Sequence, residues 1–172
     1  ELFVTCSDDG SLRLWDQCNK LSGAQSMHSS FQFHLTDEST GQPLALKGVV
    51  NCGHYIIAYT TDRQVLVFQV LESRMNMVCS FQVGTEPNSA ITSLCSLNQY
   101  LFAVSMTTSV IYIFDTRYFF SPFFSVPVSK LSISPQHRFI KSIDGSAQAL
   151  FVATSSGYMV CFDLRFNLPI NT

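Results

Sequence analysis

Charged side chains are scarce in this sequence of 172 residues. They make up 13% of the chain, while 47% of its residues are hydrophobic. A typical globular domain is roughly 25% charged. Intrinsic disorder needs low hydrophobicity and high net charge, so a disordered chain is excluded. The ten lysines and arginines never cluster, which excludes a nucleic-acid binder that relies on a basic surface.

Long hydrophobic runs are also missing. Residues 110–114 form one of the longest apolar runs, and it is far shorter than the roughly 20 residues of a membrane-spanning helix. The chain opens without a charged stretch followed by an apolar segment, so we expect no secretory signal. Because it starts at Glu1 and not at methionine, we expect further sequence upstream.

Closely spaced cysteines are absent too. The six cysteines lie far apart in the chain, at Cys6, Cys18, Cys52, Cys79, Cys95 and Cys161. Zinc sites normally use close pairs, and disulfide frameworks suit small secreted chains. The four histidines are scattered, with no carboxylate at ligand spacing beside them. We therefore predict reduced thiols, no catalytic residues, no metal site and no cofactor site.

The sequence does contain a repeat. Residues 3–16 combine a short apolar run, a polar turn and a second apolar run that ends in an aromatic residue and an aspartate. The same shape returns three times, with aromatic anchors spaced 53, 46 and 48 residues apart at Trp15, Phe68, Phe114 and Phe162. Aspartates follow three of these anchors, at Asp16, Asp115 and Asp163. Because these acids recur with the repeat, we expect them to accept backbone N–H bonds at turns and not to catalyse a reaction.

Each unit has the pattern of a β-hairpin, near residues 2–17, 55–70, 101–116 and 150–165. Valine, isoleucine, tyrosine and phenylalanine favour the extended chain. Gly10 and Gly157 supply the positive φ angle that a tight hairpin turn requires. The turns at Asp62-Arg63 and Thr108-Ser109 lack glycine, so we expect them to be longer or less regular.

The second strand of each unit is apolar at nearly every position, which indicates that both of its faces are covered. Radially stacked sheets provide that cover. Outer strands are expected near residues 31–35 and 79–83, and inner strands near 44–50, 91–97 and 139–143. Repeats of about 40–50 residues with aromatic-Asp ends are typical of WD-repeat β-propellers. We predict an all-β, partial WD-repeat propeller across residues 1–172, with three to four blades of an expected seven and with Trp15 and Phe162 in its core.

Both ends of the chain resemble one family. The C-terminal residues that carry the resemblance are Thr154, Ser155, Ser156, Gly157, Met159, Cys161, Phe162, Asp163, Arg165, Phe166, Leu168, Pro169 and Ile170. Residues 3–10 and the pair Trp15-Asp16 carry it at the other end. The pattern is similar to the WD-repeat propeller of the regulatory, protein-kinase-like subunit of class III phosphatidylinositol 3-kinase.

The resemblance implies a non-catalytic scaffold in endosomal or vacuolar sorting and autophagy. It implies docking against the coiled-coil subunits of the complex and against the lipid kinase catalytic subunit. The protein would then be cytoplasmic, with only peripheral contact to endosomal or autophagic membranes and no role in binding nucleic acid. Any kinase-like domain would lie outside these residues.

Short motifs suggest other functions. Asp115-Thr116-Arg117 and Asp163-Leu164-Arg165 resemble the Asp-x-Arg boxes of WD-repeat substrate receptors of cullin-RING ubiquitin ligases, where the arginines face an adaptor. The structural alternative is that each arginine pairs with a nearby aspartate. His137-Arg138-Phe139 is similar to a protein-kinase catalytic loop, but Phe139 stands where the base belongs, so no kinase site is expected. A propeller enzyme would need converging acids and histidines, which the sequence does not show.

The densest aromatic stretch is residues 118–124, with five rings in seven positions. Exposed aromatic patches are typical of binding hot spots. The expected arrangement is that the aromatic rings pack onto a neighbouring blade. The alternative is a partner contact, and it would involve Arg117, Tyr118, Phe119, Phe120, Phe123, Phe124 and Arg165.

Overall fold

The computed structural model describes residues 2–19, 25–37, 39–71, 74–86, 88–119 and 126–170, without the side chains of residues 2, 16–19 and 25–28. This part of the chain is built of β-strands and two short 3₁₀ helices, η1 (Thr116–Tyr118) and η2 (Pro135–His137). No helix within it is long and apolar enough to cross a membrane. The predicted all-β class is confirmed.

The strands form four antiparallel sheets in chain order. Sheet 1 contains β1 (Leu2–Cys6), β2 (Ser11–Asn19) and β3 (Gln25–His34). Sheet 2 contains β4 (Leu46–Cys52), β5 (Tyr55–Thr60), β6 (Gln64–Leu71) and β7 (Arg74–Gln82). Sheet 3 contains β8 (Ile91–Ser96), β9 (Leu101–Met106), β10 (Val110–Asp115) and β11 (Ser129–Ser132). Sheet 4 contains β12 (Ile140–Gly145), β13 (Ala149–Thr154), β14 (Met159–Asp163) and β15 (Leu168–Ile170).

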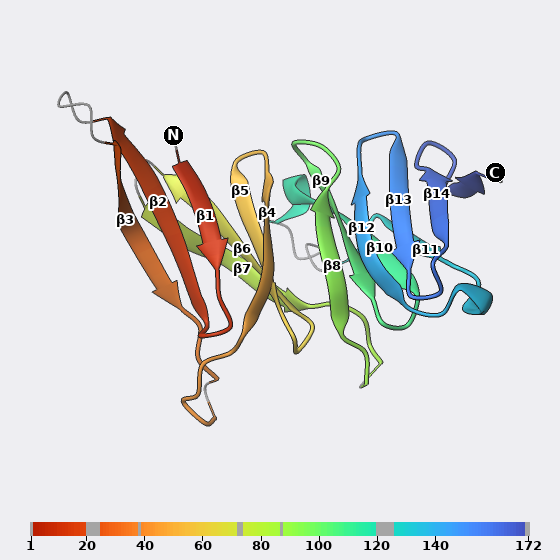
Figure 1. Ribbon diagram of the computed structural model, residues 1–172, viewed down its shortest axis with the longest axis horizontal. Coiled ribbons are helices and arrows are strands. Elements are labelled where there is room, and N and C mark those ends of the chain that lie inside the picture. Colours follow the sequence, from red (N-terminus) through yellow and green to blue (C-terminus); the bar gives the residue numbers. More distant parts are fainter. Residues whose placement is uncertain are drawn as a thin grey trace.

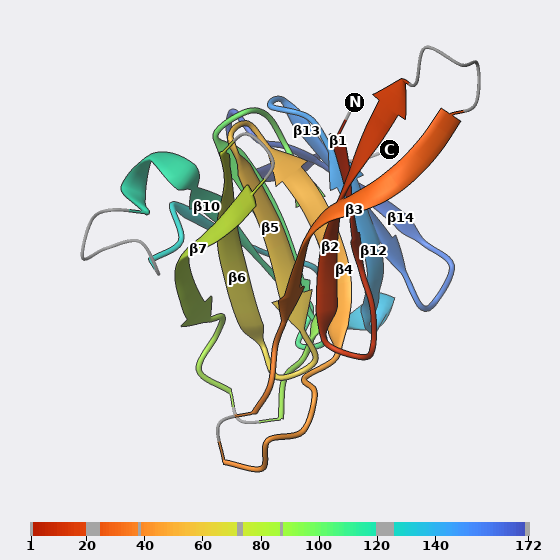
Figure 2. The same ribbon diagram turned by 90° about the vertical axis from the view of Figure 1, so that its left-hand side faces the viewer.

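The sheets stand side by side, with the two ends of the chain at opposite ends of the row (Figure 1). Figure 2 shows the strands of sheet 2 in the order β4, β5, β6 and β7. The first strands of neighbouring sheets touch, β4 against β8 and β8 against β12, so these strands line the inner side of the row. The segments predicted as inner and outer strands occupy those places. This arrangement is a partial propeller.

The four hairpin turns at the lower end of Figure 1 share one geometry. Each has a residue with a positive φ angle, at Gly10 (77°), Arg63 (63°), Ser109 (63°) and Gly157 (85°). In the first three turns the carbonyl group of this residue accepts an N–H bond from a residue just beyond the last strand of the same sheet, namely Leu35, Val83 and Ile133. Each turn therefore fixes where the chain leaves the sheet.

The turns without glycine are as tight as the others, so the expectation of longer or less regular turns is wrong. A positive φ angle costs a residue with a side chain roughly 1–2 kcal/mol. The Arg63 guanidinium offsets part of this cost by donating to the carbonyl groups of Gly84 (3.2 Å) and Glu86 (2.8 Å). Ser109 Oγ likewise donates to the carbonyl group of Arg138 (2.5 Å).

A core of apolar side chains lies between each pair of neighbouring sheets. The second hairpin strands contribute to both of their neighbours, which explains why they are apolar throughout. In β10, for example, Ile111 and Ile113 pack toward sheet 4, whereas Phe114 packs toward sheet 2. Leu12 and Leu14 of β2 pack toward sheet 2.

The aromatic anchors of sheets 2, 3 and 4 are buried, and each faces the preceding sheet. Phe68, Phe114 and Phe162 are exposed by 0%, 1% and 3%. Trp15 occupies the equivalent position in sheet 1 but is only half-buried, because no described sheet precedes sheet 1. The core position predicted for Phe162 is confirmed and that for Trp15 is wrong.

The cysteine side chains that the structure describes are all free thiols, at Cys6, Cys52, Cys79, Cys95 and Cys161. Burial raises the pKa of Cys52 to about 11 and that of Cys95 to about 12. The thiolate is the reactive form, so iodoacetamide at pH 7.5 should leave both thiols unmodified in the folded chain and modify both in urea. Peptide mass spectrometry would measure this, and labelling of either thiol without urea would contradict the buried positions.

Candidate interaction surface

The first Asp-x-Arg box lies where β10 ends, at the upper end of Figure 1. Asp115 Oδ1 accepts the backbone N–H of Arg117 at 2.9 Å and its Nε at 2.9 Å, while Asp115 Oδ2 accepts Nη2 at 2.5 Å. The Asp115 side chain is only 4% exposed. These hydrogen bonds from Arg117 hold the pKa of Asp115 below its usual value.

The second box repeats this geometry where β14 ends. Asp163 Oδ1 accepts the backbone N–H of Arg165 at 2.9 Å and its Nε at 3.0 Å, and Asp163 Oδ2 accepts Nη2 at 2.6 Å. The structural alternative considered from the sequence is therefore present: each arginine pairs with the aspartate two residues before it. The Arg117 and Arg165 side chains nevertheless stay 63% and 64% exposed, so part of each guanidinium still faces solvent.

Aromatic rings lie beside both arginines. The Arg117 guanidinium is 5.2 Å from the centre of the Tyr100 ring, and that of Arg165 is 5.5 Å from the Phe166 ring. The exposed fractions of Tyr100, Tyr118 and Phe166 are 43%, 49% and 68%. We call Tyr100, Arg117, Tyr118, Arg165 and Phe166 the rim patch. Sequence reasoning did not single out Tyr100 or Phe166 as contact residues, although Tyr100 follows the polar pair Asn98-Gln99 in a turn.

The repeat places these residues at one end of the molecule. The backbone N–H of Thr116 donates to the carbonyl group of Tyr100, and that of Leu164 donates to the carbonyl group of Gln148, both at 2.8 Å. In sheets 3 and 4 the segment that follows the third strand is thus hydrogen-bonded to the turn between the first two strands. The two boxes therefore stand in equivalent places on adjacent sheets.

The residues named for the aromatic contact lie in different environments. Phe119 is 3% exposed and packs against Tyr55 and Phe102, with ring centres 5.2 and 6.1 Å apart, so the expected packing describes this ring. Arg117, Tyr118 and Arg165 lie on the surface, and a contact through them stays a prediction. Phe120, Phe123 and Phe124 lie outside the described residues, as does the side chain of Asp16.

The ion pair in the first box predicts a pH dependence. A carboxyl group whose pKa is lowered by folding stabilises the fold above its unfolded pKa of about 3.9 and loses that contribution as the pH falls through the folded value. We expect Asp115→Asn to lower the free energy of unfolding by about 1 kcal/mol at pH 6 and by less near pH 2.5. Urea unfolding at several pH values would show this. The exposed Asp62→Asn variant is the control, and an equal loss at both pH values would contradict the assignment.

The outer face of sheet 4 exposes apolar side chains. Phe151, Met159 and Ile170 are 47%, 71% and 46% exposed. Met159 occupies the repeat position of Leu12 and Ile111, which are fully buried between sheets. This face is therefore built like the faces that neighbouring sheets cover.

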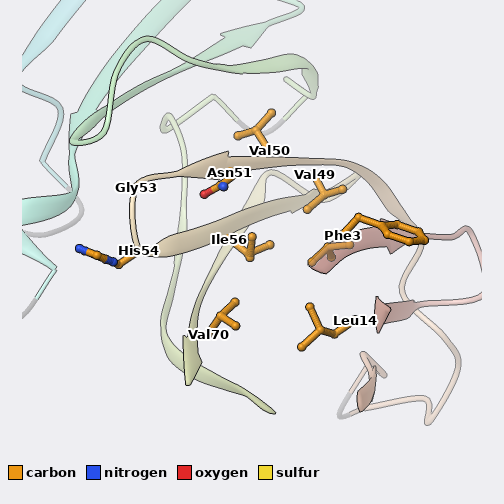
Figure 3. A pocket seen from close by; sticks show the side chains of 10 residues that line it. Phe3, Leu14, Val49, Val50, Asn51, Gly53, His54, Ile56 and Val70 are labelled. Atoms are coloured by element: carbon orange, nitrogen blue, oxygen red, sulfur yellow. The ribbon is translucent and has the colours of Figure 1, made fainter. Parts of the chain in front are cut away.

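A hollow of about 440 Å³ lies between sheets 1 and 2. Phe3, Leu14, Val49, Ile56 and Val70 contribute apolar side chains to its wall, Asn51 lies above them, and Gly53 and His54 lie at the left side (Figure 3). In the part of the chain that the structure describes, no three His, Cys, Asp or Glu side chains are grouped to hold a metal ion.

Solved structures with the same fold exist, whereas no protein-family model and no curated protein matches the sequence. The crystal structure of Saccharomyces cerevisiae Sqt1 matches 98% of this chain with a TM-score of 0.70 and 15% sequence identity. That of Chaetomium thermophilum Raptor matches 99% with a TM-score of 0.69 and 16% identity. The chain spans 44% of the first protein and 15% of the second. Both are WD-repeat propeller proteins, so this chain has the fold of a partial WD-repeat propeller.

Proposed function

We propose that this chain is a non-catalytic scaffold that binds other proteins. The rim patch is the observation that carries the proposal. Tyrosine and arginine are enriched at binding hot spots, and here a guanidinium group lies beside an aromatic ring on the surface of each of two adjacent sheets. The aspartates hold both arginines in one orientation, so less side-chain entropy is lost when a partner binds.

The more specific proposal is that the chain is the propeller of the regulatory subunit of a class III phosphatidylinositol 3-kinase complex. The sequence resemblance at both ends of the chain supports it, and a partial WD-repeat propeller is compatible with it. The partners would be the lipid kinase catalytic subunit and the coiled-coil subunits. The protein would then act in the cytoplasm, at endosomal or autophagic membranes.

A second proposal is a WD-repeat substrate receptor of a cullin-RING ubiquitin ligase. The two Asp-x-Arg boxes support it, because both arginines are more than half exposed at equivalent places. In this proposal the rim patch contacts the ligase adaptor.

Affinity capture of the full protein from its own cells separates the two proposals. We expect the lipid kinase catalytic subunit to be recovered, and its recovery to fall at least tenfold in the double variant Arg117→Ala, Arg165→Ala. The control is Arg74→Ala, which removes an exposed arginine of β7. Thermal unfolding would verify that the double variant is folded.

The outcomes are distinct. Recovery of a cullin adaptor without the lipid kinase would overturn the first proposal and support the second. Recovery of neither would overturn both. Unchanged recovery of the kinase in the double variant would support membership of the complex and overturn the role of the rim patch.

A further inference from the structure

The inner strands β4, β8 and β12 share an irregularity just after their first residue. In each of them one extra residue interrupts the pairing with the next strand, at Lys47, Thr92 and Lys141. A bulge of this kind aims the side chain of the extra residue away from the regular alternation of the strand. The three side chains therefore occupy equivalent places in three sheets.

The lysine of the first bulge has an acidic partner in the preceding sheet. Lys47 Nζ donates to Asp8 Oδ1 at 2.8 Å. In sheet 4 the bulged residue is Lys141, and Thr107 of sheet 3 holds the place of Asp8, since each lies two residues before the positive-φ residue of its turn. Thr107 and Lys141 line a hollow of about 450 Å³ between sheets 3 and 4. Within the described part of the chain, Lys141 forms no ion pair.

Carboxylates are missing from the lower end of sheets 3 and 4. The acidic residues within 88–119 and 126–170 are Asp115, Asp144 and Asp163. Asp115 and Asp163 pair with arginines of the rim patch at the opposite end, and Asp144 adjoins the β12–β13 turn at that same end (Figure 1). The lower end of these two sheets thus exposes the cations Arg138 and Lys141 without a carboxylate of its own.

An exposed aromatic ring lies beside the hollow. Phe139 directly precedes β12, lines the hollow and is 58% exposed. Its N–H donates to Ser155 Oγ at 3.2 Å, and its carbonyl group accepts the N–H of Ser155 at 2.8 Å. Ala90 forms the same two bonds with Thr107, at 3.0 and 2.9 Å. The ring of Phe139 therefore stands where sheet 3 has only a methyl group.

The backbone before this ring is fixed in an unusual conformation. Arg138 has a φ angle of 59° and a ψ angle of −133°, which residues with a side chain rarely adopt. Its N–H donates to the carbonyl group of Pro135 at 3.1 Å, and its own carbonyl group accepts Ser109 Oγ at 2.5 Å. These bonds hold the segment that carries Phe139, so less conformational entropy is lost when a partner binds.

We propose that this hollow is a second docking site of the chain, which binds an acidic segment of a partner protein. We call its lining residues the Lys141 site, namely Thr92, Thr107, Phe139, Ile140 and Lys141. A carboxylate of the partner takes the place at Lys141 that Asp8 takes at Lys47, and an apolar side chain next to it packs on Phe139. Thr107 Oγ1 accepts the N–H of Ala90, so its hydroxyl hydrogen is left to donate to the same carboxylate.

Selection from a library of random short peptides tests the proposal. The phage-displayed library is selected on the full protein and counter-selected on the double variant Phe139→Ala, Lys141→Met. Both residues are exposed, so thermal unfolding should show that this variant is folded. We expect the surviving peptides to share an aspartate or glutamate beside an apolar residue. By fluorescence polarisation, replacing that acid by its amide should weaken binding by about fivefold or more.

A carboxylate placed in the chain itself should compete with the peptide. Thr107→Asp recreates the arrangement of Asp8 and Lys47, so it should weaken binding by about fivefold or more. Thr61→Asp is the matched control, because Thr61 has the same place in the turn of sheet 2, where the bulged residue of the next sheet is Thr92. That variant should change the affinity by at most about twofold.

Several results would overturn the proposal. Failure of any peptide to survive the counter-selection would do so, as would surviving peptides without a shared acid. Binding to the Thr107→Asp variant as tight as to the unchanged protein would show that Lys141 does not receive the carboxylate. The double variant Arg117→Ala, Arg165→Ala should bind the peptides normally, so a failure here is distinguishable from a failure of the rim patch.

Discussion

Replacing Phe114 by alanine should lower the free energy of unfolding by about 3–5 kcal/mol. The ring is 1% exposed in the core between sheets 2 and 3. It packs on Phe81 and Phe102, with ring centres 5.1 and 5.3 Å away. The substitution removes these contacts and leaves a cavity that the two rigid sheets cannot close. Urea unfolding followed by circular dichroism would measure the loss.

Trp15→Ala is the matched control, because Trp15 holds the same repeat position in sheet 1. Its ring contacts Phe3 on one face, with centres 6.1 Å apart, and its Nε1 donates to Thr5 Oγ1 at 2.9 Å. We expect a loss of about 1–2 kcal/mol, since much of the ring already faces solvent. Equal losses in the two variants would show that another sheet covers Trp15 in solution.

The sequence predicts the strands well because the repeat and the two-sided apolar pattern act together. A strand such as β10 can be apolar on both faces only if a sheet lies on either side of it. The sequence pattern alone therefore predicts stacked sheets. Ile111 and Phe114 then lie in two different cores, as the pattern indicates.

The sequence does not predict how well each repeat position is covered. Trp15 and Phe114 occupy the same position, but their burial depends on whether a sheet precedes them. The same holds for Met159 in sheet 4, which is 71% exposed at a position that is buried elsewhere. The local sequence pattern predicts that a segment is a strand, but it does not predict whether a neighbouring sheet covers that strand.

The backbone geometry of the turns is the second feature that the sequence does not predict. Glycine is the usual signal of a positive φ angle, so Arg63 and Ser109 give no warning of one. Their side chains form hydrogen bonds to segments 21 to 29 residues away in sequence. In the rim patch, Arg117, Tyr118 and Arg165 are predicted from the sequence, but Tyr100 is not. Tyr100 reaches Arg117 only when the chain has folded back on itself. Such contacts between distant segments leave no local mark in the sequence.

Gly53→Ala is the second substitution with a large expected effect. Gly53 lies in the turn between β4 and β5 and has a φ angle of 61°. A Cβ atom on this residue would overlap the backbone oxygen of Gln99, in the turn between β8 and β9. The adjacent Cys52 thiol donates to the carbonyl group of Asn98 at 3.3 Å. The two turns therefore fit together only when residue 53 has no side chain.

We expect Gly53→Ala to lower the free energy of unfolding by about 3 kcal/mol or more. Gly157→Ala is the control, because its φ angle is also positive, at 85°, and a Cβ atom there would meet nothing within 4 Å. That variant bears only the backbone strain, about 1–2 kcal/mol. The difference between the two measured by urea unfolding isolates the overlap between turns. If both variants lose the same amount, the turns of sheets 2 and 3 do not touch in solution, and the close packing of these sheets at their upper end is wrong.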